Sequence, residues 1–191
     1  RGEEYMSDEQ LVHFKQMLNN WRRELMEEVE AADEERAAEV RRSFGEFLAV
    51  MAERELQTFS SLLWMAETST KLAETEPTAE LAKQMHGRAV TAYDSIISRA
   101  AEDSTFCSAR TVSAIRNRLA KSLRRAGQYD RAIQLMAGLL TLSPNSYSMQ
   151  FEAAGAIEEW GRDTDDKDRL LEAIRGRGDS LWGWGGISVT L

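Results

Sequence analysis

The segment from Ala114 to Pro144 constrains the fold most, because it reads as two short helices joined by a tight turn. Apolar and small residues recur in it at the three- and four-residue steps of amphipathic helices. Gly127 lies between the two runs, where a residue without a Cβ relieves the backbone of a short turn. Ala120 and Ala132 are small, as the crossing point of two packed helices requires. The segment therefore predicts an antiparallel helical hairpin that ends at Pro144.

This hairpin resembles the tetratricopeptide repeat, a helix-turn-helix unit used mainly to bind other proteins. The resemblance is carried by Leu119, Ala120, Leu123, Gly127, Tyr129, Ala132, Ile133, Leu139 and Pro144. A weaker copy precedes it, with Ala89 and Tyr93 four residues apart, and a third begins at Ser146. The ending, with Trp182 and Gly186, resembles tetratricopeptide proteins of planctomycete type. Over about residues 44–191 the resemblance implies an all-α, right-handed solenoid of antiparallel helix pairs with a concave groove.

The N-terminal segment predicts one long amphipathic helix, because Phe14, Leu18, Trp21 and Leu25 recur at three- and four-residue steps. Residues 2–30 resemble the first helix of the DksA family, bacterial transcription factors that act on RNA polymerase. That family carries paired aspartates at a hairpin tip and, usually, a four-cysteine zinc module, whereas this sequence has one cysteine and no matching tip segment. The resemblance implies an alternative function, that of a DksA-like regulator that binds RNA polymerase. Two resemblances in one chain would fit a fusion or chimera.

The stretch from Ala31 to Arg42 is rich in charge and alanine, and we expect it to be a solvated helical connector. Ser43 and Glu46 have the capping-box spacing that predicts the start of the next helix. We therefore expect an N-terminal helical extension over residues 1–42 and a tetratricopeptide-like domain over residues 43–191. Pro77 predicts a loop within the second of these.

Composition narrows the classes of partner. The 24 Lys and Arg against 32 Asp and Glu give a net charge of −8, which argues against direct nucleic-acid binding. No apolar run is long enough to span a bilayer, so we expect no membrane partner. Cys107 is the only cysteine and is expected to be a small buried or half-buried residue. Because it cannot form an internal disulfide, we expect a cytoplasmic protein.

No pattern in the sequence points to catalysis, a cofactor or a metal site. There is no phosphate-binding glycine loop, no zinc-protease motif and no nucleophile elbow. His13 and His86 lie far apart, and neither has another His or Cys within helical reach, so we interpret both as ordinary helix residues. The acidic runs are interpreted as solvated faces. We therefore expect a protein that is not an enzyme.

A basic strip in the central hairpin is the candidate partner-binding site. Asn117, Lys121 and Arg124 are spaced four and three residues apart, so they share one helix face, and Arg125 follows directly. The resemblance implies that this face lines the concave groove. Such a strip would attract an acidic peptide or a C-terminal carboxylate, although its side chains could instead be solvated or pair with acids of a neighbouring helix. We predict a non-catalytic scaffold that binds a protein or acidic peptide, and a second copy could complete the last repeat.

Overall fold

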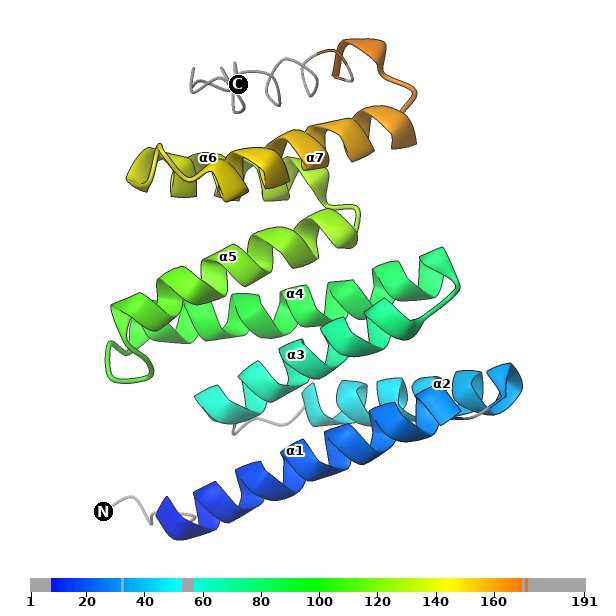
Figure 1. Ribbon diagram of the computed structural model, residues 1–191. Helices are drawn as coiled ribbons and strands as arrows, with labels where there is room; N and C mark the ends of the chain where they lie inside the picture. Colours follow the sequence, from blue (N-terminus) through cyan, green and yellow to red (C-terminus); the bar gives the residue numbers. More distant parts are fainter. Residues whose placement is uncertain (1–7, 32, 53–56, 170, 172–191) are drawn as a thin grey trace.

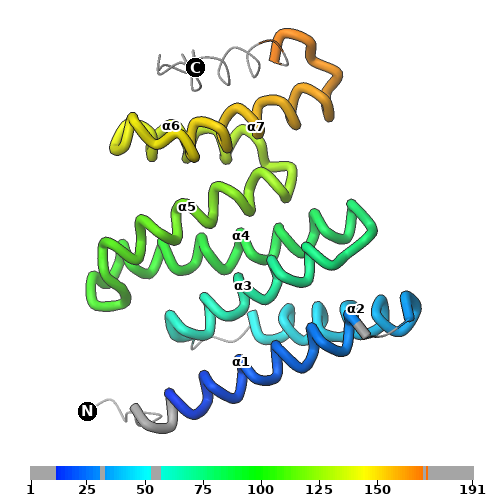
Figure 2. Tube along the Cα trace, in the orientation of Figure 1, coloured from blue at the N-terminus to red at the C-terminus, as the bar shows by residue number. Residues whose placement is uncertain are grey.

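The computed structural model describes residues 8–31, 33–52, 57–169 and 171, and these contain helices and no strand. The long helices are α1 Asp8–Ala31, α2 Glu34–Ala52, α3 Phe59–Thr75, α4 Ala79–Glu102, α5 Ala109–Arg125, α6 Tyr129–Leu142 and α7 Tyr147–Asp163. Helices adjacent in sequence pack against each other, and the chain runs back and forth through a stack with α1 at one end and α7 towards the other (Figures 1 and 2). The expected all-α class is confirmed.

The central hairpin forms as the sequence predicts, from α5 and α6. Gly127 has a φ of 76° in the turn between them, a conformation that favours glycine. The N–H of Gln128 donates to the carbonyl of Leu123 over 2.9 Å and closes the end of α5. Ala120 and Ala132 are fully buried. Their burial agrees with small residues lying between packed helices, and α5 and α6 are in contact.

The loops on either side of this hairpin also lie where the sequence places them. The side chain of Ser108 accepts a hydrogen bond from the N–H of Thr111 over 3.1 Å and caps α5. Pro77 lies between α3 and α4, and α7 begins directly after Ser146. Cys107 is half-buried, as expected. Trp182 and Gly186, and with them the end of the predicted last repeat, lie outside the described residues.

The second helix differs from expectation. The predicted helix start at Ser43 is wrong, because α2 begins at Glu34 and Ser43 lies inside it. The preceding residue, Asp33, provides the cap, and its Oδ1 accepts a hydrogen bond from the N–H of Arg36 over 3.0 Å. As a result, α2 runs without a break through the expected domain boundary between residues 42 and 43.

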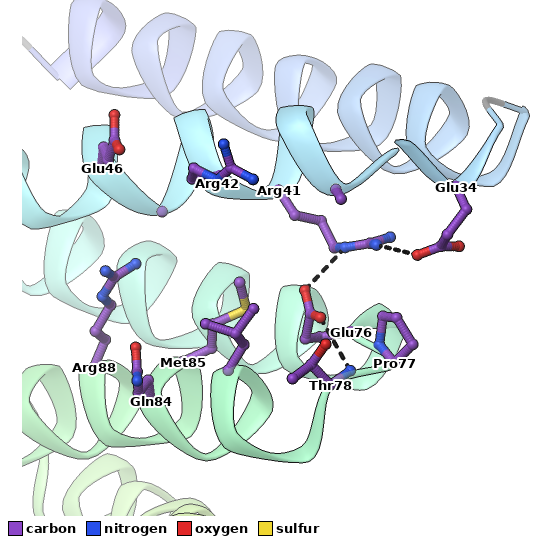
Figure 3. Close-up of a pocket in the computed structure, with 13 residues that line it drawn as sticks. Glu34, Arg41, Arg42, Glu46, Glu76, Pro77, Thr78, Gln84, Met85 and Arg88 are labelled. Atoms are coloured by element: carbon purple, nitrogen blue, oxygen red, sulfur yellow. Dashed lines mark hydrogen bonds and ion pairs between the residues drawn. The ribbon is translucent and has the colours of Figure 1, made fainter. Parts of the chain in front are cut away.

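The stretch from Ala31 to Arg42, which we expected to be solvated, also contributes to the packing. Ala37 and Arg41 are each only 2% exposed. The Arg41 guanidinium donates to Glu34 Oε1 over 2.8 Å and to Glu76 Oε2 over 3.0 Å (Figure 3). Glu76 follows α3, so this buried ion pair fastens α2 to the loop between α3 and α4. A charged residue is tolerated here because its charge is matched and its hydrogen bonds are satisfied.

Candidate protein-binding groove

A groove of about 760 Å³ lies between the α3–α4 hairpin on one side and helices α5 and α7 on the other. Four helices and the start of α6 contribute side chains to it. Its charged lining consists of Glu74, Lys83, Lys121, Arg124, Arg125, Glu152, Glu159 and Asp163. Four side chains of each sign therefore face one cavity, and their pairing decides which charges a partner would meet.

The groove contains three of the four residues predicted as a binding strip. Lys121, Arg124 and Arg125 all line it. Asn117 does not, and its side-chain amide donates to the carbonyl of Ser113 within its own helix over 3.2 Å. Of the three residues that the four- and three-residue spacing put on one face, Lys121 and Arg124 line the groove and Asn117 does not, and the adjacent Arg125 lines it as well.

Arg124 is held firmly by two acidic residues of α7. Its Nε and Nη2 bind the two oxygens of Glu159 over 2.8 and 2.7 Å, and its Nη1 binds Glu152 over 2.7 Å. The hydrogen bonds that Arg124 donates to Glu159 raise the pKa of Arg124. Burial raises the pKa of Glu159, but the Arg124 guanidinium outweighs this and leaves the pKa below its ordinary value. With 15% of its side chain exposed, Arg124 joins α5 to α7 through charge-assisted bonds.

The backbone of α7 is shaped around this guanidinium. A Cβ added at Gly155 would lie 2.9–3.0 Å from the Nη2, Cζ and Nη1 atoms of Arg124. A glycine at position 155 therefore leaves room for the Arg124 guanidinium. Glu152 and Glu159, which bind this guanidinium, lie about one turn before and one turn after Gly155 on α7. Arg124 therefore pairs with acidic residues of a neighbouring helix, which was one of the alternatives for the basic strip.

The remaining acids of α7 are also engaged. Lys121 lies 3.5 Å from Glu152, and Lys83 lies 3.4 Å from Asp163. The Tyr129 hydroxyl donates to Asp163 over 2.7 Å. Burial, together with this hydrogen bond, raises the pKa of Tyr129, and the same bond lowers the pKa of Asp163. Ion pairs inside the groove therefore neutralise most of its charge.

Three titratable side chains of the groove make no such pair among the described residues, and they are Glu74, Arg125 and His86. Arg125 is exposed and forms no hydrogen bond or ion pair there. His86 of α4 is only 8% exposed, and its buried Nδ1 has no hydrogen-bond partner in the described part of the chain. Burial, and then the positive charge of Arg125, lowers the pKa of His86. Sequence reasoning missed His86, because residue spacing does not reveal that α4 packs against α5.

A second cavity, of about 340 Å³, separates α2 from the α3–α4 hairpin. Arg41 and Glu76 form its buried ion pair, Arg42, Glu46 and Arg88 also line it, and Figure 3 shows Arg88 extending from α4 towards α2. A Cβ at Gly45 would lie 2.5 Å from the Arg88 guanidinium, so α2 leaves room for this side chain. Three arginines face three glutamates here, and the cavity carries no surplus of either charge.

An apolar groove of about 740 Å³ lies along α1 and α2 at the end of the stack. Met17 and Trp21 are 50% and 41% exposed along it. The Trp21 ring packs edge-on against Phe44 and Phe47 at centroid distances of 5.2 and 5.1 Å. These contacts hold α1 on α2 while leaving part of the indole at the surface.

The fold and the groove define a class of protein: a stack of helical pairs with a mixed-charge groove between two of them. Within the described residues, no three His, Cys, Asp or Glu side chains are placed to hold a metal ion. None of the described helices combines the length and apolar character needed to cross a bilayer. No protein family, curated protein or solved structure matches this chain.

Proposed function

We propose that this chain is a non-catalytic scaffold, a tetratricopeptide-like right-handed solenoid that binds an acidic peptide or partner helix in the groove between α3–α4 and α5–α7. The supporting observation is the convergence of Lys121, Arg124 and Arg125 on one open groove. We place this activity in the cytoplasm and expect neither nucleic acid nor a membrane as the direct partner. Affinity would come from apolar burial at the groove wall and from charge-assisted hydrogen bonds.

Within this proposal, the three basic residues have different roles. Arg124 is committed to Glu152 and Glu159, so a partner could use it only by breaking short hydrogen bonds. Lys121 is exposed and its 3.5 Å contact with Glu152 is of the kind that contributes little to stability. Arg125 is exposed and unpaired within the described residues, and we expect it to be the main contact for a partner's carboxylate.

The test is selection of peptides from a randomised library on the wild-type protein, followed by affinity measurement on two charge-reversed variants. Arg125→Glu should weaken binding of the selected acidic peptides at least tenfold. Arg116→Glu is the matched control: Arg116 is exposed on the same helix, does not line the groove, and its substitution changes the net charge equally. Equal losses in both variants would reject the groove, and a library that yields no acidic peptide would reject the partner class.

The DksA-like alternative rests on the sequence of residues 2–30. Residues 8–30 of this segment lie in α1, which packs on α2 as part of the stack. Copurification with RNA polymerase that is abolished by deleting α1 would favour the alternative. Retention of peptide binding in the same deletion would assign the two activities to different parts of the chain.

A further inference from the structure

We infer that the groove holds a carboxylate of its peptide partner between Arg125 and His86, and that His86 takes up one proton when the carboxylate binds. This inference rests on the proposed function and specifies the chemistry of recognition at the same site. His86 comes from α4 and Arg125 from α5, so the site spans the contact between two helix pairs.

The geometry of His86 is the first argument. Its side chain lines the groove, is more than nine-tenths buried, and makes no hydrogen bond within the described residues. Buried polar atoms in native proteins are nearly always partnered, and an exception calls for an explanation such as an absent ligand. A ligand oxygen that met this nitrogen after a rotation of the imidazole towards the groove would supply the missing partner.

The charges around His86 are the second argument. The titratable and charged side chains that face the groove come from α3 through α7, and they are Glu74, Lys83, Lys121, Arg124, Arg125, Tyr129, Glu152, Glu159 and Asp163. Ion pairs engage Lys83, Lys121 and Arg124, and the charge that acts on His86 is that of Arg125. Arg125 forms no ion pair, although its charge also acts on Glu159 and the unpaired Glu74 faces the same groove among the described residues. With a protonated imidazole beside it, its guanidinium matches a singly charged carboxylate. A doubly charged phosphate would be opposed by the acids of α7.

The direction of the coupling follows from these groups. In the free protein, burial and Arg125 lower the pKa of His86, so the imidazole is neutral at neutral pH. A carboxylate placed beside it favours the protonated form and raises that pKa. Binding therefore takes up a proton, and affinity increases as the pH falls below neutral. The increase approaches about tenfold for each unit by which the carboxylate raises the pKa, and this limit is reached only at a pH below the pKa of the free protein.

The experiment follows His86 directly by NMR. The chain has two histidines, so the His13→Gln variant leaves His86 as the single imidazole signal. The probe is an octapeptide of glutamate, and an octapeptide of glutamine and a phosphoserine peptide of equal length are the comparisons. We expect the glutamate peptide to raise the pKa of His86 by about one unit and to bind roughly threefold more tightly at pH 6 than at pH 7.5, because the full tenfold gain is reached only below the pKa of the free protein. The glutamine peptide should do neither.

Variants separate the possible failures. His86→Gln should abolish the pH dependence, while Arg125→Gln should raise the pKa of His86 even without peptide, because Arg125 lowers it in the free protein. If the glutamate peptide binds but the pKa of His86 does not move, the inference is wrong and the proposed scaffold function survives. If the peptide does not bind at any pH, the inference is wrong, and the proposed scaffold function falls with it only if the library selection also yields no acidic peptide. Stronger binding of the phosphoserine peptide would replace the carboxylate by a phosphoryl group and reject the inference.

Discussion

At the scale of single residues, two neighbouring arginines should behave differently when truncated. Arg124→Ala leaves Glu152 and Glu159 facing each other without their shared cation, and we expect a loss of about 2 kcal/mol in the free energy of unfolding. Arg125→Ala removes an exposed, unpaired guanidinium and should change stability by less than about 0.5 kcal/mol. Urea unfolding of both variants measures the difference. Coincident midpoints would show that the Arg124 pairs contribute nothing to stability.

The same pair of arginines shows where prediction from sequence stops at this scale. Helical spacing placed Lys121 and Arg124 on one surface, because periodicity depends only on the local backbone. It could not distinguish the roles of adjacent arginines, since the two glutamates that bind Arg124 lie 28 and 35 residues away on α7. His86 was missed for the same reason, because its burial and its neighbour Arg125 both depend on how α4 packs against α5.

At the scale of elements, two glycines in open space should respond in opposite directions to the same added methyl group. Neither Gly127 nor Gly138 has any atom within 4 Å of the position of an added Cβ. Gly127→Ala should destabilise the protein by about 1 kcal/mol, because its φ of 76° is unfavourable for an L-residue. Gly138→Ala, inside α6, should stabilise it by about 1 kcal/mol through helix propensity. Thermal unfolding monitored by circular dichroism tests both, and shifts in the same direction would contradict the backbone explanation.

A helix or hairpin could be predicted from the sequence when the residues that determine it lie close together in the chain. The α5–α6 hairpin was predictable because a glycine turn and two small crossing residues all lie within one short segment. The start of α2 was not, because Ser43 and Glu46 imitate a cap inside a helix whose cap is Asp33. The burial of Arg41 could not be foreseen either, since its partner Glu76 lies 35 residues further along the chain.

At the scale of the whole molecule, a stack of helices should open from its end. Helix α4 is packed between α3 and α5, whereas α1 packs on α2 and reaches α3 through the ion pair between Arg22 and Glu67 (Figure 1). In such arrays stability is close to a sum of contributions from neighbouring units. We therefore expect the amide hydrogens of α1 to exchange through local opening at a lower free energy than those of α4.

Hydrogen exchange followed by mass spectrometry measures this difference, and Trp21→Ala sharpens it. This substitution removes the edge-on contacts with Phe44 and Phe47 and should speed exchange in α1 and α2. Exchange in α5 and α6 should stay unchanged, because the described ring contacts of Trp21 are with Phe44 and Phe47 of α2. In a stacked array the loss of stability is passed only between neighbouring helices. Equal acceleration in all helices would show that the stack unfolds as one cooperative unit. In that case α1 would be an integral part of the scaffold and not a separable extension.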